Sequence, residues 1–247
     1  MADEIHISQG DIARAKQKLG HADSPISLST GSLKDSALRL LRRKFYDQEK
    51  AMYKQKYLGR VVEGRPVNSC RIASAIIALA RMGVIGLNEQ SMTTLERELV
   101  ESAVKNNHVA ASGDTGPSVP YIILTEFGLP TGFANSVAQV EAALKAGGCV
   151  CFGRSGHSRC ATELSPDGRQ IKVFDPLQDI SSIEPLRIMD DRVRAYSGQM
   201  ETEAVVVYPP NYQPNPAKGE IFYPPGVVNN LPPVNFNPIP ININRYK

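Results

Sequence analysis

The spacing of hydrophobic residues along the chain changes once, near residue 148. Before that point apolar residues recur at intervals of three and four, and Ser or Asn before a segment with Gly or Asn after it marks helix ends. We expect helices over residues 36–59, 67–83, 91–107, 118–128 and 136–148. The segment "VNSCRIASAIIALARMG" (67–83) is apolar around most of its circumference, which indicates a helix buried at the centre of the fold.

After residue 148 the pattern is that of short strands. β-Branched and apolar residues fill the runs "CVCFGR", "HSRCATEL", "QIKVFDP" and "TEAVVVYP", at residues 149–154, 157–164, 170–176 and 202–209. The segment "SPDGR" predicts a turn between the second and third runs. Helices come first and strands second, so we expect an α+β fold in which N-terminal helices pack on a C-terminal antiparallel sheet.

Composition divides the chain into three regions. Residues 1–35 are polar and Ser-rich, which predicts a mobile leader. Residues 36–208 hold the periodic segments and form the predicted domain. Residues 209–247 are rich in Pro and Asn, which predicts an extended, polyproline-like tail that lies on the body or is free.

Charge and hydropathy narrow the range of partners. A net charge of +3 is too small to indicate an obligatory nucleic-acid partner. No apolar run is long enough to cross a bilayer, and the N-terminal residues lack the pattern of a signal peptide. We therefore expect a soluble chain without a transmembrane segment, which is either cytosolic or exported without a cleaved signal peptide.

The four cysteines, Cys70, Cys149, Cys151 and Cys160, are too few and too clustered to act as disulfide staples, so we expect reduced thiols. Cys70 stands in the first turn of the predicted central helix, where free N–H groups and the helix dipole favour a thiolate. The same N–H groups can receive the negative oxygen of an attacked carbonyl. Cys70 is therefore the candidate nucleophile.

His157 begins one predicted strand and Asp175 ends the next, which suits a general base and the group that orients it. A two-residue loop at Asp167 and Gly168 would place them on opposite faces of the hairpin. An odd-length loop, such as residues 165–169, would make them diagonal neighbours roughly 7–8 Å apart, within reach of a hydrogen bond. We therefore expect an odd-length loop.

The motifs "NSCRIAS", "GHS" and "KVFDP" resemble those of the papain-like cysteine hydrolases. They are especially similar to a divergent branch that contains bacterial effector proteases and toxin-type glutamine deamidases, and the resemblance spans residues 64–208. It implies a Cys70 nucleophile, a His157 general base and an orienting Asp175, with no cofactor. Together with the predicted mobile leader and the lack of a signal-peptide pattern, the resemblance suggests a bacterial effector protease delivered into another cell, where a host protein is the substrate.

The sequence departs from that family at two positions. Papain has a glutamine six residues before the cysteine as an oxyanion donor, whereas this chain has Gly64 there. The Trp that often follows the cysteine is absent, because the chain contains no Trp. Asn68 or backbone N–H groups are the candidates for the missing donor.

Three alternatives remain open. The same three residues would serve a glutamine deamidase or a transglutaminase-like effector. In the second alternative the chain is a non-catalytic protein that binds its partner through the Pro-rich tail or through the basic run at 39–60. The basic run would contact nucleic acid or an acidic surface. Finally, Cys149, Cys151, His157 and Cys160 are a candidate zinc set, but their spacing lacks the C-x2-C pair, so we expect core thiols instead.

Overall fold

The structure, a computed structural model, describes residues 38, 40–56, 59–86, 88–154, 156–190, 193, 202–220 and 242–246. It divides into two compact units, residues 1–47 and residues 48–247. In the first unit residues 40–46 form a helix. The predicted leader at 1–35 lies outside the described residues.

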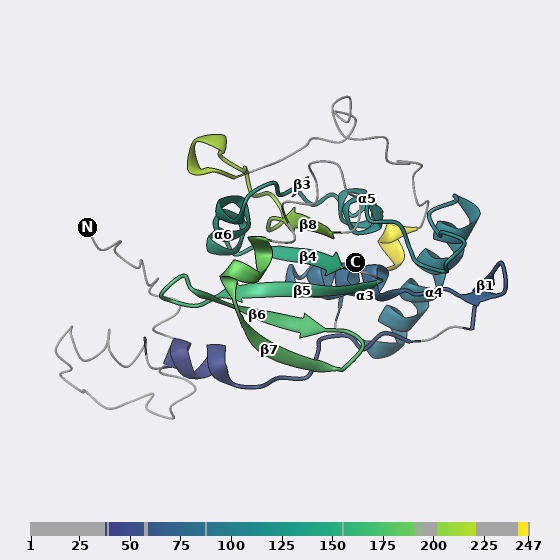
Figure 1. The fold of residues 1–247 in the computed structure, drawn as a ribbon, viewed down its shortest axis with the longest axis horizontal. Coiled ribbons are helices and arrows are strands. Elements are labelled where there is room, and N and C mark those ends of the chain that lie inside the picture. Colours follow the sequence, from purple (N-terminus) through teal and green to yellow (C-terminus); the bar gives the residue numbers. More distant parts are fainter. Residues whose placement is uncertain are drawn as a thin grey trace. The chain divides into compact units, whose positions relative to one another are not determined.

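The second unit is built on an antiparallel sheet with the strand order β3-β8-β4-β5-β6-β7 (Figure 1). The strands are β3 (Thr131–Phe133), β4 (Cys149–Arg154), β5 (His157–Leu164), β6 (Gln170–Asp175), β7 (Ile180–Pro185) and β8 (Thr202–Val207). A small separate hairpin pairs β1 (Val61–Val62) with β2 (Arg65–Pro66). The four predicted strands are confirmed. The sequence pattern did not reveal β3 and β7, because β3 has only three residues and β7 carries polar residues at half of its positions.

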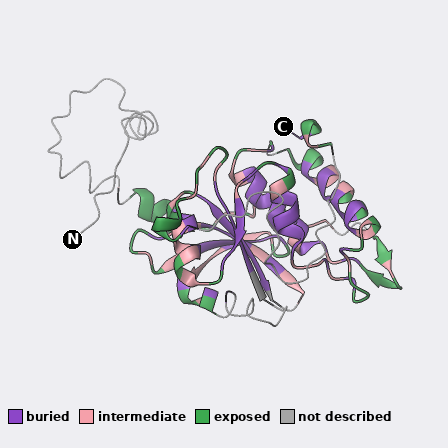
Figure 2. Ribbon diagram, turned by 90° about the horizontal axis from the view of Figure 1, so that it is seen from above, coloured by how far each residue is buried: buried purple, intermediate pink, exposed green. Residues whose placement is uncertain are grey.

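Helices cover both faces of this sheet. The described helices are α3 (Cys70–Arg81), α4 (Glu89–Lys105), α5 (Val119–Glu126) and α6 (Val137–Lys145), close to the predicted ranges. One core cluster joins α3, α4 and α5 to one sheet face, and the other joins α6 to the opposite face. Figure 2 shows the strands and α3 as largely buried. The α+β class is confirmed.

Helix α3 is central, as its all-round apolar sequence predicts. Ten of its twelve residues are buried, and it packs against β4, β5, α4 and α5. Ser69 is its N-cap residue, and Cys70 is its first residue. Among the described residues no helix is both long enough and apolar enough to cross a membrane.

The helix predicted over residues 36–59 is wrong in its second half. Helical structure ends at residue 46, and residues 48–56 take an irregular path instead. Ser181 N donates to Glu49 O at 2.7 Å, and Gln55 N donates to Pro176 O at 2.8 Å. This segment therefore gives backbone partners to the edge strand β7 and to the turn after β6, and that tertiary pairing outweighs helix propensity.

The described basic residues of 39–60 consequently do not share one helical face. Those in the described part of 48–60 lie outside any helix, and two of them pair with acidic residues. Lys56 Nζ is 2.6 Å from Glu89 Oε1, and Arg60 Nε is 3.6 Å from Glu101 Oε2. The contact with nucleic acid or an acidic surface stays a prediction, but it lacks the continuous helix on which it was based.

The hairpin of β5 and β6 has the register expected at His157 and Asp175, but a β-bulge produces it and not the length of the loop. The last pair before the turn is Leu164 with Ile171, so an even number of residues closes the hairpin, and the predicted odd-length loop is wrong. A β-bulge between Ala161 and Glu163 adds one residue to β5 and restores even-with-even pairing at Cys160 and Phe174. The residues beyond the bulge, His157 and Asp175, therefore still face the same side.

The predicted extended tail is only partly described. Residues 221–241 and 247 lie outside the described residues. The remaining parts contain short 3-10 turns at Pro216–Lys218 and Ile243–Arg245, so the described tail is not extended throughout. Tyr246 is buried in the core cluster of α3 and α4, and Arg245 pairs with Glu98 at 2.8 Å. The described C-terminal residues thus lie on the body.

Gly153 on β4 allows close approach to His157, and its replacement tests that packing. A Cβ at Gly153 would lie 2.7 Å from the carbonyl oxygen of His157. We expect Gly153→Ala to lower the free energy of unfolding by about 1–3 kcal/mol, because the backbone of β5 must move. Gly86→Ala is the matched control, since a Cβ there meets nothing within 4 Å. Urea unfolding measures both, and equal stability of the two variants would contradict the tight packing.

Candidate functional site

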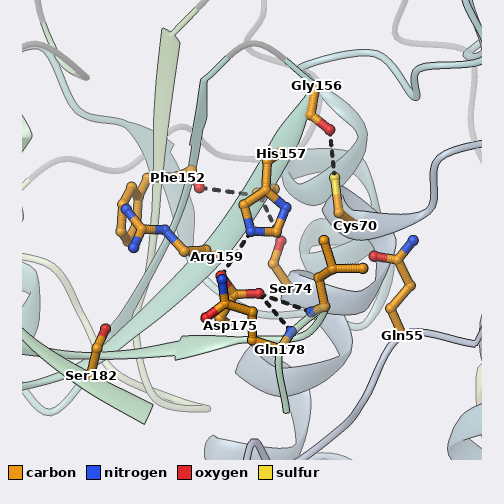
Figure 3. Close-up of polar contacts among 12 residues, drawn as sticks. Gln55, Cys70, Ser74, Phe152, Gly156, His157, Arg159, Asp175, Gln178 and Ser182 are labelled. Carbon is orange, nitrogen blue, oxygen red and sulfur yellow. Dashed lines mark hydrogen bonds and ion pairs between the residues drawn. The ribbon is translucent and has the colours of Figure 1, made fainter. Parts of the chain in front are cut away.

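The structure brings the three residues predicted from sequence to one place. Cys70 begins α3, His157 begins β5 and Asp175 ends β6. His157 Nε2 lies 2.9 Å from Asp175 Oδ2, and the other ring nitrogen lies on the side of Cys70 (Figure 3). If Nε2–H donates to the carboxylate, the neutral ring has its free lone pair at Nδ1. His157 is therefore oriented to accept a proton from the direction of the thiol.

Asp175 is held in place by its own hydrogen bonds. Its Oδ1 accepts from the backbone N–H of Leu177 at 2.9 Å and of Gln178 at 3.2 Å, which leaves Oδ2 for His157. Burial acts to raise the pKa of Asp175, but the hydrogen bonds from His157 and these N–H groups outweigh it and lower the pKa. The carboxylate is thus ionised at neutral pH and suited to stabilise an imidazolium.

The Cys70 thiol contacts the backbone on both sides of His157. Its Sγ donates to Gly156 O at 3.4 Å, and the Ser158 backbone also hydrogen-bonds to it. The pairing of β5 with β6 begins at Cys160 and Phe174, so residues 157–159 of β5 are not paired with β6. Among the described contacts there is no direct hydrogen bond between Cys70 and the His157 ring.

The thiolate expected at Cys70 is not the resting form in this structure. Only 2% of Cys70 is exposed, and burial raises the pKa of its thiol to about 11. Arg71 and the backbone hydrogen bonds from Ser158 and Arg71 oppose this effect but are weaker. The prediction from the helix N-terminus is wrong for this conformation, because desolvation outweighs the helix end.

Asn68 lies beside the start of α3, and its side chain is oriented by four contacts. Its Nδ2 donates to Gly156 O and, at 3.3 Å, to Asp114 Oδ1. Its Oδ1 accepts from Cys70 N–H at 3.3 Å and from Gln55 Nε2 at 3.5 Å. Gly156 O and Asp114 are acceptors, so the amide nitrogen must face them. Asn68 therefore presents a carbonyl oxygen to the helix, which does not fit the oxyanion donor predicted there.

Gln55 is the site residue that sequence reasoning missed. It lies beside Cys70 (Figure 3), and its Oε1 is buried without a hydrogen-bond partner in the described structure. Its backbone N–H donates to Pro176 O, next to Asp175. No local motif marks this glutamine, because the pairing of residues 48–56 with the β6–β7 region brings it to the site.

The remaining cysteines lie in the core, as expected. Cys149, Cys151 and Cys160 face α3 from the sheet and are fully buried, with Cys151 directly opposite Cys160. Burial, together with the two neighbouring thiols, raises the pKa of Cys160. His157 is engaged with Asp175 instead of joining these thiols. The four candidate zinc ligands are therefore not brought together.

Removal of the Asn68 side chain should uncover the thiol. In the native chain we expect slow alkylation of Cys70 by iodoacetamide at neutral pH and a rate that rises toward pH 11, because a raised pKa reduces the thiolate fraction. Asn68→Ala admits water and should return the pKa toward its ordinary value of about 8.5, giving about tenfold faster labelling per pKa unit recovered.

Peptide mapping by mass spectrometry over a range of pH measures this labelling. Asn135→Ala serves as the control, since Asn135 is exposed and its side chain is remote from these contacts. If Asn68→Ala labels no faster than the control, Asn68 does not cover Cys70.

Comparisons with known proteins complete the description of this site. No model of a known protein family matches the chain, and no curated protein matches its sequence. The chemistry of the site itself must therefore indicate the function.

Proposed function

We propose that the protein is a papain-like thiol hydrolase that attacks an amide of a protein substrate, most simply as a cysteine protease effector. The observation that carries the proposal is the 2.9 Å contact between His157 and Asp175 beside a thiol at the start of a buried helix. The α+β architecture, with the cysteine on a central helix and the His–Asp pair on the sheet, supports it. So do the motifs around Cys70, His157 and Asp175.

The proposed reaction has two steps. His157 Nδ1 takes the thiol proton as Cys70 Sγ attacks the carbonyl carbon of the amide, and the resulting imidazolium then protonates the leaving nitrogen. A thioester remains on Cys70, and water activated by His157 hydrolyses it to a carboxylate and restores the thiol. Throughout, Asp175 fixes the ring tautomer and stabilises the imidazolium.

Two donors near Cys70 are suited to bind the oxyanion. The N–H of Cys70 and the Nε2 of Gln55 both point at one oxygen, the Oδ1 of Asn68. In the proposed mechanism the substrate carbonyl oxygen takes the place of that atom after the Asn68 side chain rotates away. Gln55 then supplies the donor that the sequence led us to seek at Asn68.

The burial of the thiol is consistent with this sequence of events. In the described conformation the sulfur is buried, is hydrogen-bonded to Gly156 O and stays protonated. In the proposed mechanism Asn68, which also bonds Gly156 O, shields this sulfur. Displacement of Asn68 would expose the sulfur to solvent and to Nδ1 of His157. Binding of substrate and activation of the nucleophile would thus depend on the same movement.

Acyl transfer from 4-nitrophenyl acetate tests the proposal without a known substrate. We expect release of nitrophenolate and an acetyl group on Cys70, with Cys70→Ala inactive and His157→Ala slower by roughly 10²–10⁴-fold, because the base is lost. Gln55→Ala should be slower by roughly 10²–10³-fold, because an oxyanion donor is lost. Absorbance measures the rate, and peptide mapping locates the acetyl group.

Gln90→Ala is the control for Gln55→Ala, because Gln90 is exposed at the start of α4. Equal rates in the native chain and in Cys70→Ala would contradict the proposal. That result would favour the non-catalytic protein that binds through its tail or basic residues.

A further inference from the structure

Glu96 is a fully buried carboxylate on α4 that contacts two separate segments of the candidate site. Its Oε2 accepts from Tyr53 Oη at 2.5 Å and from the backbone N–H of Lys56 at 3.0 Å. Its Oε1 accepts from Ser69 Oγ at 2.5 Å. One side chain thus fixes the segment 48–56 and the start of α3 to each other.

Both segments carry a proposed oxyanion donor. Tyr53 and Lys56 lie on either side of Gln55 in the chain, and Ser69 directly precedes Cys70. Ser69 is the N-cap residue of α3, but its side chain makes no capping hydrogen bond and is bonded to Glu96 instead. The separation of Gln55 Nε2 from the N–H of Cys70 therefore depends on where Glu96 holds these neighbours.

A carboxylate is a costly choice for this position. An ionised carboxylate loses its hydration when buried, and an apolar side chain would fill the same space without that penalty. Burial raises the pKa of Glu96, while the hydrogen bonds from Ser69, Tyr53 and Lys56 favour its charged form. An apolar residue cannot accept hydrogen bonds, whereas Glu96 accepts them from three donors on two segments and so fixes their directions.

We propose that Glu96 is a positioning residue, which holds Gln55 and the first turn of α3 at the spacing that a two-donor oxyanion site requires. This inference rests on the proposed function of Cys70. It assigns to Glu96 no contact with the substrate.

Two reagents separate this role from general support of the fold. Alkylation by iodoacetamide displaces iodide from a saturated carbon, so no oxyanion forms and Gln55 is not needed. Acetylation by 4-nitrophenyl acetate passes through a tetrahedral oxyanion. The ratio of the acetylation rate to the alkylation rate of Cys70 therefore reports on the oxyanion site alone.

We expect Glu96→Gln to lower this ratio by at least about tenfold, since its amide nitrogen cannot accept from the donors that a carboxylate oxygen binds. Tyr53→Phe removes one of the hydrogen bonds and should lower the ratio less. The double variant Gln55→Ala with Glu96→Gln should be no slower than Gln55→Ala, because both changes act on one donor. Glu101→Gln is the control, with the same charge change at an exposed position of α4.

Two results would overturn the inference alone. The first is that Glu96→Gln and Tyr53→Phe have the same ratio of acetylation rate to alkylation rate as the control. The second is that, in a double variant with Gln55→Ala, their effects on this ratio add in full to that of Gln55→Ala. If the native chain is not acetylated at Cys70, the proposed function fails, and this inference fails with it. Circular dichroism checks that the variants fold, and if Glu96→Gln does not, Tyr53→Phe and Ser69→Ala decide the question.

Discussion

The packing of α3 across the sheet is the constraint on which the candidate site depends. The helix is buried along nearly its whole length, and several of its residues, such as Ile72, Ile76 and Leu79, have no exposed surface. Each fully buried aliphatic side chain contributes on the order of 1.5–3 kcal/mol, so the helix cannot slide or rotate without a large loss. Cys70 is the first residue of this helix and is therefore fixed beside Gly156, at the start of β5.

That packing also explains why the thiol is protonated here. The partial positive charge at a helix N-terminus lowers the pKa of a thiol. Removal of the sulfur from water raises that pKa more strongly. Only 2% of Cys70 is exposed, and burial raises the pKa of its thiol to about 11. In the mechanism that we propose, the Asn68 side chain rotates to activate Cys70 while the helix itself stays fixed.

Buried polar groups organise the surroundings of the site. Asp175 and Glu96 both lie in the interior and both accept hydrogen bonds from groups on distant segments. Such carboxylates hold their partners in defined directions, since a lost partner leaves a costly unsatisfied group. The irregular segment 48–56 acquires its path in this way, from Glu96 on one side and from the backbone of β7 and Pro176 on the other.

The sequence by itself determined the helices α3 to α6 and the strands β4, β5, β6 and β8. It also selected Cys70, His157 and Asp175 as candidate site residues. These follow from local periodicity and from residue types at the ends of elements. Tertiary structure alone decided the path of residues 48–56, the position of Gln55 and the bulge that restores the register of His157 and Asp175. It also decided the burial of Cys70. The physical reason is that periodicity encodes which face of an element is buried, whereas desolvation and long-range hydrogen bonds exist only after distant segments have come together.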